Sequence, residues 1–199
     1  LTEWLWPDLA PQRALAALHT TLHALRQSLQ AGLGPAAADL VAVEGEQYGV
    51  VLGPGDEWDA AEFLAAAGAL DTEPGAERLE RVAAAEARYT GVFLPEWPYE
   101  TWAQQHRERL ERAYCQVLEV AAEELTRAGR PVAAVRRYEL LLEREPEREH
   151  WHRGLMRAFA QAGERGLALR QYHACRVLLR DALGVDPSAQ TQDLYRSLL

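Results

Sequence analysis

Three polar side chains recur on one face of the first long helical pattern in the chain. His19, His23 and Arg26 are spaced by four and then three residues, so a helix would place them on one stripe. Two histidines at this spacing can bind Zn²⁺, but no Glu follows His19 and no third ligand stands nearby in the sequence. We therefore favour a polar stripe that faces solvent or a ligand over a metal site, and we predict no cofactor.

The sequence contains no recognisable catalytic motif. No glycine-rich loop joins a strand to a helix, and no set of Ser, His and Asp can be singled out. His150 and His152 flank Trp151 on one helical turn and cannot face the same way. The 30 acidic residues lie in helical runs where a solvated, ion-paired face is expected. We predict no catalytic or metal-binding residues and no enzyme activity.

The polar stripe needs a helix to hold it, and the sequence predicts one from about Pro11 to Gln30. Residues 40–43 and 48–52 then predict the two strands of a β-hairpin. Residues 2–8 would be the end of a preceding helix, with Trp4 and Leu5 packing inward. Leucines at alternating spacings of three and four would form the apolar side of the long helix: Leu15, Leu18, Leu22, Leu25 and Leu29.

A helix with a donor-rich face followed directly by a β-hairpin is the arrangement of a winged helix-turn-helix. The polar side chains of such a helix contact phosphates or base edges in the major groove of DNA. Residues 1–52 carry only two arginines against five acidic residues, a net charge of −3, so this module alone should bind DNA weakly. The side chains predicted to contact DNA are Arg13, His19, Thr20, His23 and Arg26.

A second pattern repeats every 34 residues in the later part of the chain. Gly129 and Gly163, Ala134 and Ala168, and Tyr138 and Tyr172 each have this separation, which is the period of a tetratricopeptide repeat. Such helices are too short to bury their apolar faces alone, so neighbouring pairs must complete the core, and the groove that they line usually binds a protein. The predicted helix pairs are 57–70 with 75–89, 102–128 with 131–144, and 147–162 with 165–183, followed by a capping helix over 190–199.

An apolar segment interrupts this array between the first and second helix pairs. Residues 91–102 are too apolar for a free linker, so we expect Phe93, Leu94, Trp97 and Trp102 to fold back on the repeat core. The alternative is that they form a dimer contact or a surface for a partner. We likewise interpret four of the six tryptophans as core or inter-helix residues rather than an exposed platform: Trp58, Trp97, Trp102 and Trp151.

The composition is that of an ordinary globular protein, with 48% hydrophobic and 26% charged residues among 199. Cys115 and Cys175 lie in helical patterns without a Cys-x-x-Cys spacing, so two buried thiols are favoured over a disulfide. No apolar run approaches the roughly 18 residues needed to span a bilayer, and no signal peptide is evident, which predicts a cytoplasmic protein without membrane contact. The chain begins at Leu1 and its only Met is Met156, so either an initiator methionine has been removed or, as we favour, the chain is a piece of a longer protein.

A series of short motifs recurs in a fixed order along the chain. They are Leu5-Trp6-Pro7-Asp8, residues 24–29, Asp59-x3-Phe63, Tyr89-x-Gly91-x-Phe93-Leu94-Pro95 with Trp102 and Arg107, residues 145–156, Ala168-Leu169-x2-Tyr172 and Leu183-Gly184-Val185-x-Pro187. Together they resemble the SARP family of bacterial transcriptional activators. In that family an OmpR-type winged helix binds direct repeats in promoters, and a tetratricopeptide-like bacterial transcriptional activation domain packs against it, helps dimerise the protein and helps recruit RNA polymerase.

The sequence thus predicts a mostly α protein, with a tetratricopeptide-like helical-repeat domain preceded by a partial winged helix-turn-helix with a β-hairpin. We place the winged-helix part at residues 1–52 and the activation domain at residues 56–199. The resemblance implies a DNA-binding activator with promoter DNA and RNA polymerase as partners, and a homodimer as a further expectation. Two alternatives are a protein-interaction scaffold that has lost DNA binding and a regulatory segment of a larger signalling protein.

Overall fold

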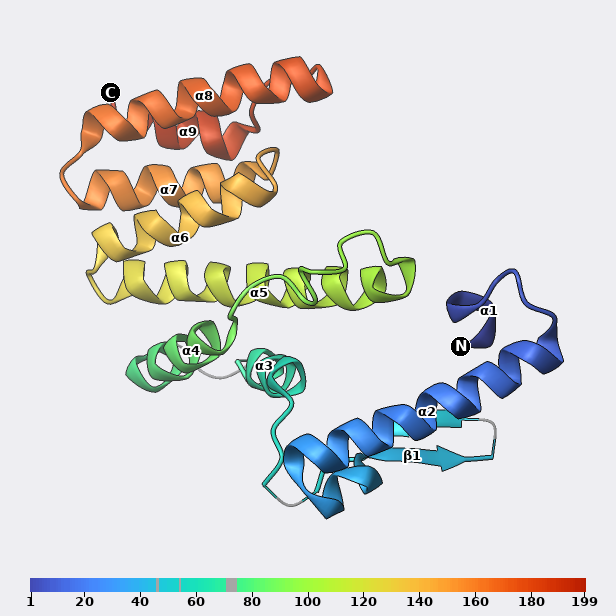
Figure 1. The fold of residues 1–199 in the computed structure, drawn as a ribbon. Helices are drawn as coiled ribbons and strands as arrows, with labels where there is room; N and C mark the ends of the chain where they lie inside the picture. The colour runs from blue at the N-terminus through green and yellow to red at the C-terminus, as the bar shows by residue number, and fades with distance from the viewer. Residues whose placement is uncertain (46, 54, 71–74) are drawn as a thin grey trace. The chain divides into compact units, whose positions relative to one another are not determined.

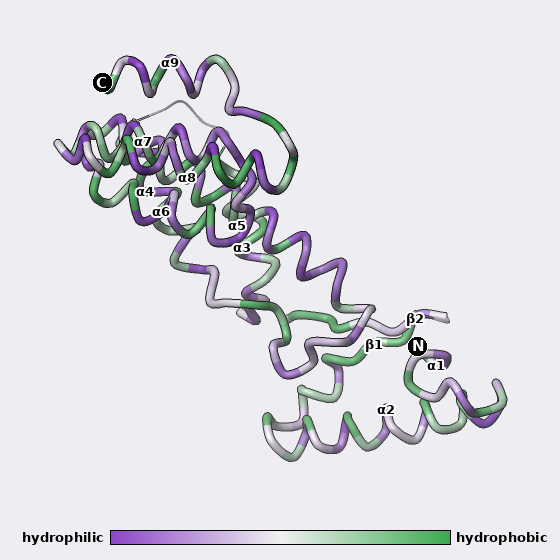
Figure 2. The backbone as a smooth tube through the Cα atoms, turned by 90° about the horizontal axis from the view of Figure 1, so that it is seen from above, coloured by the Kyte–Doolittle hydropathy of each residue, from purple (hydrophilic) through white to green (hydrophobic). Residues whose placement is uncertain are grey.

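A computed structural model describes residues 1–45, 47–53, 55–70 and 75–199, which form two compact units, Leu1–Glu57 and Trp58–Leu199 (Figure 1). Both units are built mainly from helices, and the colours of Figure 2 alternate along them, as amphipathic helices require. Within the described ranges no helix is long and apolar enough to cross a membrane. The predicted fold class, helical repeats after a partial winged helix, is confirmed.

The first unit consists of one long helix with short elements on either side of it. A single helical turn, α1 (Thr2–Leu5), precedes α2 (Pro11–Leu33), and a 3₁₀ helix, η1 (Pro35–Leu40), leads into β1 (Val41–Glu44) and β2 (Gln47–Val50). The predicted helix is confirmed and runs three residues further than expected, ending where Gly34 precedes a proline. The strands pair antiparallel with Val41 opposite Val50, which confirms the hairpin.

The prediction that Trp4 and Leu5 pack inward is wrong. Both side chains are more than half exposed, and α1 buries none of its residues. The physical reason is the length of α1, because one helical turn whose main neighbour is α2 can bury only one of its sides.

The second unit is a stack of antiparallel helices. Figure 1 shows α5, α6, α7 and α8 side by side, and each contacts the next along the chain. All predicted helices are present, with ends that differ from the expected ones by a few residues. They are α3 (Asp59–Gly68), α4 (Ala76–Arg88), α5 (Thr101–Arg127), α6 (Pro131–Arg144), α7 (Glu149–Gln161), α8 (Arg165–Leu183) and α9 (Ala189–Ser197).

Two glycines end the first helices of the second and third pairs, as the 34-residue spacing predicts. Gly129 and Gly163 have φ angles of 69° and 81°, a left-handed conformation that glycine adopts without a Cβ clash. The following amide nitrogens, of Arg130 and Glu164, donate back into the helices to Leu125 O at 2.8 Å and to Phe159 O at 2.9 Å. These bonds satisfy terminal carbonyls and turn the chain into the next helix.

Small residues let the stacked helices approach closely. Ala134 and Ala168 are fully buried, as predicted for the faces between paired helices. A third small residue was not predicted: Gly154 of α7 lies against the ring of Tyr138 on α6, and a Cβ at residue 154 would stand 2.3 Å from a ring carbon. The array therefore depends on the absence of a side chain at this point.

Cys115 and Cys175 are both buried and free, which confirms the prediction of two thiols. Burial raises the pKa of the Cys115 thiol to about 11 and that of Cys175 to about 12. Both side chains therefore stay protonated at neutral pH and act as small apolar core residues.

Residues 91–102, which we call the aromatic segment, are held by a single side chain of α5. The Arg107 guanidinium donates to the carbonyl oxygens of Phe93 at 2.9 Å, Pro98 at 3.1 Å, Leu94 at 3.3 Å and Glu100 at 3.4 Å, and to that of Trp97. All five N–H donors of the side chain are used. The segment has few backbone hydrogen bonds of its own, so this one cation takes the place of a secondary-structure partner.

The expectation that this segment folds back on the core holds only in part. Phe93 is half-buried and packs against the core of α3, α4 and α5, and Leu94 is also half-buried. Trp97 is 58% exposed and Trp102 is 41% exposed, so the predicted burial of these two is wrong. Arg107 fixes the backbone through its carbonyls, which leaves these large side chains free to point outward.

The wider prediction for the tryptophans is correct for one of four. Trp151 is buried in the core formed by α5, α6 and α7. Trp58 is half exposed, because it precedes α3 and lies outside the helix that its neighbours form.

The contact between Gly154 and Tyr138 predicts the effect of a single methyl group. Gly154→Ala should lower the free energy of unfolding by about 1–3 kcal/mol, because the new Cβ overpacks the junction of α6 and α7. The matched control is Gly166→Ala in α8, where a Cβ meets no atom within 4 Å and the change should stabilise the helix. Urea unfolding followed by circular dichroism measures both, and equal stabilities of the two variants would contradict this account of the packing.

The Arg107 hydrogen bonds predict a local effect on the aromatic segment. Arg107→Lys keeps the charge but loses the planar fork of five donors, so exchange of the hydrogen-bonded amides of Trp97 and Glu100 should accelerate at least tenfold. Arg109→Lys, an exposed arginine two residues along the same helix, is the control and should leave the exchange unchanged. Unchanged exchange in Arg107→Lys would mean that other contacts hold the segment.

Candidate functional site: a polar helix face and an aromatic pocket

The side chains predicted to contact DNA are arranged along α2, and four of them are available to a ligand. Arg13, His19, Thr20 and His23 are exposed. The Thr20 hydroxyl donates to Ala16 O at 3.0 Å, a bond within the helix that leaves its oxygen free to accept. This face therefore offers imidazole, hydroxyl and guanidinium groups from one rigid helix.

The fifth predicted residue, Arg26, has a contact within the first unit. Its Nη2 donates to Val41 O at 2.8 Å, and the side chain is half-buried. This hydrogen bond joins α2 to the first residue of β1 and so helps to place the hairpin beside the helix. Its other guanidinium donors are not engaged by any group in the described part of the chain.

The apolar side of α2 is only partly covered. Leu18 is buried and Leu22 and Leu29 are half-buried, whereas Leu15 and Leu25 are exposed by more than two fifths. The prediction of one apolar stripe is therefore only partly confirmed. The main neighbours of α2 are η1 and α1, which are too short to cover a helix of 23 residues.

The electrostatics of this face differ from those of a strongly basic DNA-binding surface. The net charge of −3 over residues 1–52 leaves few cations to neutralise phosphates, a requirement for tight binding to DNA. No group of three or more potential metal ligands occurs among the described residues.

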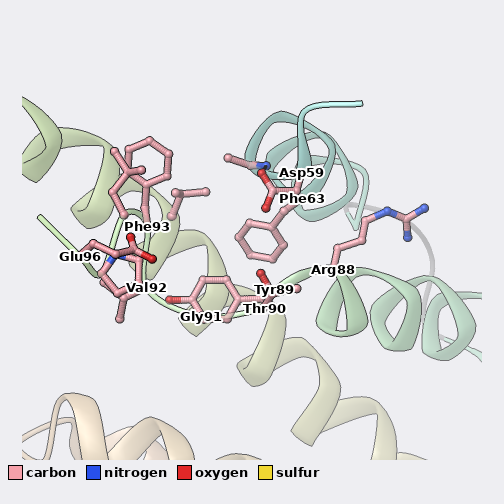
Figure 3. A pocket seen from close by; sticks show the side chains of 13 residues that line it. Asp59, Phe63, Arg88, Tyr89, Thr90, Gly91, Val92, Phe93 and Glu96 are labelled. Carbon is pink, nitrogen blue, oxygen red and sulfur yellow. Dashed lines mark hydrogen bonds between the residues drawn. The ribbon is translucent and has the colours of Figure 1, made fainter. Parts of the chain in front are cut away.

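The second unit contains a pocket of about 360 Å³ beside the aromatic segment (Figure 3). Asp59 and Phe63 approach it from α3, and Val92, Phe93 and Glu96 lie on the other side, as Figure 3 shows. Its apolar lining includes Phe63 and Leu110, which belong to the buried core. Asp59 and Glu96 add carboxylates to the lining, and Arg88 also lines it, with a guanidinium that points away from the pocket in Figure 3.

One lining residue of this pocket, Tyr89, belongs to a cluster of aromatic rings. The Tyr89 ring stacks on Tyr114 with centroids 3.8 Å apart and lies 5.2 Å from the ring of Phe63. The Tyr89 hydroxyl donates to Glu111 Oε2 at 2.8 Å, and Arg144 Nε donates to Glu111 Oε1 at 2.6 Å. Burial, together with the nearby Glu111 carboxylate, raises the pKa of Tyr89, so this hydroxyl remains a donor and a fixed structural group.

Sequence reasoning did not identify the roles of Arg107 and of this pocket. One signal was available: a stretch rich in proline and aromatic residues has many carbonyls and few amide partners, so a nearby arginine that is always charged is a natural donor to it. The pocket itself could not be inferred, because its lining residues on α3 are separated in the sequence from those of the aromatic segment and α5.

A protein-family comparison assigns the second unit. The model for the bacterial transcriptional activator domain matches residues 58–199. Regulatory protein AfsR of Streptomyces coelicolor is 32% identical over 201 residues, and transcriptional regulatory protein MoaR1 of Mycobacterium tuberculosis is 24% identical over 203 residues; each alignment covers the whole chain.

A solved structure shows the same fold over almost the entire chain. Mycobacterium tuberculosis EmbR, in a complex with a low-affinity phosphopeptide, superposes with a TM-score of 0.75 and 23% identity over 99% of this chain. The chain spans 20% of AfsR, 65% of MoaR1 and 52% of the EmbR chain. The matched region is thus only part of each of these three proteins.

The family match covers most of the chain, the relatives are regulators of the same type, and the fold agrees with both findings. None of these comparisons points to an enzyme family. The chain therefore belongs to the SARP family of bacterial transcriptional regulators, and its residues 58–199 are a bacterial transcriptional activator domain.

Proposed function

We propose that the protein activates transcription by placing α2 against promoter DNA, while the helical-repeat domain makes protein contacts that dimerise the regulator and recruit RNA polymerase. The observation that supports this most is the row of exposed donors on α2, followed directly by a β-hairpin, in a chain that carries a transcriptional activator domain. The domain boundaries that we propose are 1–52 for the winged-helix part and 56–199 for the repeat domain.

The five polar residues of α2 would make different contacts with DNA. His19, Thr20 and His23 are exposed and suited to base edges, because a hydroxyl or an imidazole can donate or accept. Arg13 would contact a phosphate. Arg26 would have two tasks, since one of its donors holds Val41 and the others remain for DNA.

The low positive charge of the first unit shapes this proposal. Few phosphates can be neutralised by residues 1–52, so affinity would depend on base contacts, on a second copy at the neighbouring repeat of the promoter, and on other parts of the natural protein. The same observation favours the second candidate function, a protein-interaction scaffold without DNA binding. The two differ in whether any duplex is bound with sequence preference.

A selection experiment separates the two candidates. The full-length natural protein is incubated with a random duplex library, and the bound sequences are amplified through several rounds. Direct repeats should be enriched, and a double variant, Thr20→Ala with His23→Ala, should bind the enriched duplex at least tenfold more weakly, since a good base contact contributes roughly 1–3 kcal/mol.

The control is His173→Ala, which removes an exposed histidine from α8 in the second unit and should not change the affinity for the duplex. Circular dichroism verifies that all variants fold. Failure to enrich any duplex at low salt would reject DNA binding and leave the scaffold function. Equal loss of affinity in the α2 variant and the control would reject α2 as the contact.

A further inference from the structure

We propose that the pocket of Figure 3 is a docking site for a basic segment of a partner protein, which inserts one large apolar side chain between α3 and the aromatic segment. This inference rests on the proposed function, because it assigns a place and a chemistry to one of the protein contacts of the helical-repeat domain. It goes further in stating which residues make the contact and which kind of sequence they recognise.

The interior of the pocket is suited to an apolar anchor. Phe63 and Leu110 line it from the buried core, and Phe93 contributes a half-buried ring. A volume of about 360 Å³ lies at the small end of ligand pockets, which fits a side chain with its adjoining backbone better than a large cofactor. Burial of an aromatic or aliphatic side chain here would remove apolar surface of both partners from water.

The aromatic segment carries further exposed apolar residues, one inside the pocket lining and two farther along the chain. Val92 lines the pocket and is 59% exposed, and Trp97 and Tyr99 are 58% and 94% exposed. Large exposed apolar groups that gather in one segment usually mark interaction sites, and tryptophan and tyrosine often dominate binding energy. These side chains are therefore candidates for contacts around the anchor.

The backbone of the aromatic segment is ordered before any partner binds. Arg107 donates to five carbonyls of the segment. Leu94 has a φ of 48°, a backbone conformation that is unfavourable for residues other than glycine. A segment that is already ordered loses little entropy when a partner binds. The fixed position of the exposed groups thus favours recognition.

The charges around the pocket favour a basic partner. Asp59, Glu96 and Glu100 have no cationic partner among the residues that the structure describes. One cation, Arg88, lines the pocket; it donates to Ala84 O at 2.9 Å and lies 4.0 Å from Glu62. Arg112 lies 3.8 Å from Glu108, and Arg107 donates into the segment. Arginine or lysine next to the anchor would find carboxylates that are not yet neutralised.

The repeat domain as a whole also carries a net negative charge. Residues 58–147 contain 18 acidic residues and 11 arginines, whereas residues 148–199 contain 5 acidic residues and 8 arginines. The negative charge is therefore concentrated in the part of the domain that holds the pocket. A basic segment would be steered to this end rather than to α7, α8 and α9.

A random-peptide library tests the proposal without DNA. Phage that display 16-residue random peptides are selected on the immobilised full chain, and the enriched peptides are synthesised with a fluorophore for anisotropy titrations. Enriched peptides should combine an aromatic or large aliphatic residue with several arginines or lysines, and their affinity should fall as the salt concentration rises.

Two pairs of surface variants test the position of the site. Val92→Ser should weaken binding at least fivefold, while Val132→Ser, at a valine of α6 that is 76% exposed, should not. Glu96→Arg should weaken binding at least tenfold, while Glu143→Arg, at an exposed glutamate of α6, should have a much smaller effect. All four positions are exposed, so thermal melting should show that each variant folds.

Several results would overturn the proposal. These are an absence of enriched peptides, enrichment of acidic or purely apolar peptides, and equal effects of the site and control variants. If sedimentation shows a dimer of the wild-type chain that Val92→Ser dissociates, the occupant is a second copy and the separate basic partner is rejected. If the wild-type protein binds promoter DNA but no peptide, only the docking site is rejected. If it binds peptides but no duplex, only the proposed contact with DNA is rejected.

Discussion

The stack of helices depends on how closely neighbouring helices can approach. None of these amphipathic helices can bury its apolar face alone, so each must complete the core of the next. At three points this requires a small residue: Ala134, Gly154 and Ala168 are buried at helix contacts, and at Gly154 the ring of Tyr138 fills the space of a side chain. The left-handed turns at Gly129 and Gly163 then return the chain along the previous helix.

That rigid stack is what allows an irregular segment to have a defined position. Arg107 projects from a helix whose buried face is fixed by α3, α4 and α6, and its guanidinium holds the carbonyls of the aromatic segment. Because this cation binds only backbone carbonyls, the side chains of the segment need not be buried to hold it in place. Trp97 and Tyr99 can therefore be exposed, which would be costly without a binding role and is useful with one.

The sequence predicted the parts of the fold that follow from the 34-residue repeat and from the glycines and prolines at helix ends. The 34-residue spacing located the helix pairs. The burial of Ala134, Ala168 and Tyr138 between these helices follows from the same repeat. It could not predict which aromatic residues are exposed, because hydrophobic content alone does not reveal that a neighbouring arginine supplies the hydrogen bonds of the segment. It also missed the contact of Arg26 with Val41, since the reach of a side chain across a turn depends on where the hairpin lies.

The central claim is that α2 contacts DNA while the helical-repeat domain serves protein contacts. Hydrogen exchange of the full-length regulator, measured with and without its promoter duplex, tests this division directly. The account predicts slower exchange over residues 11–33 when DNA is bound, with unchanged exchange over residues 91–102. Protection of residues 91–102 by DNA, or the absence of any protection in α2, would contradict it.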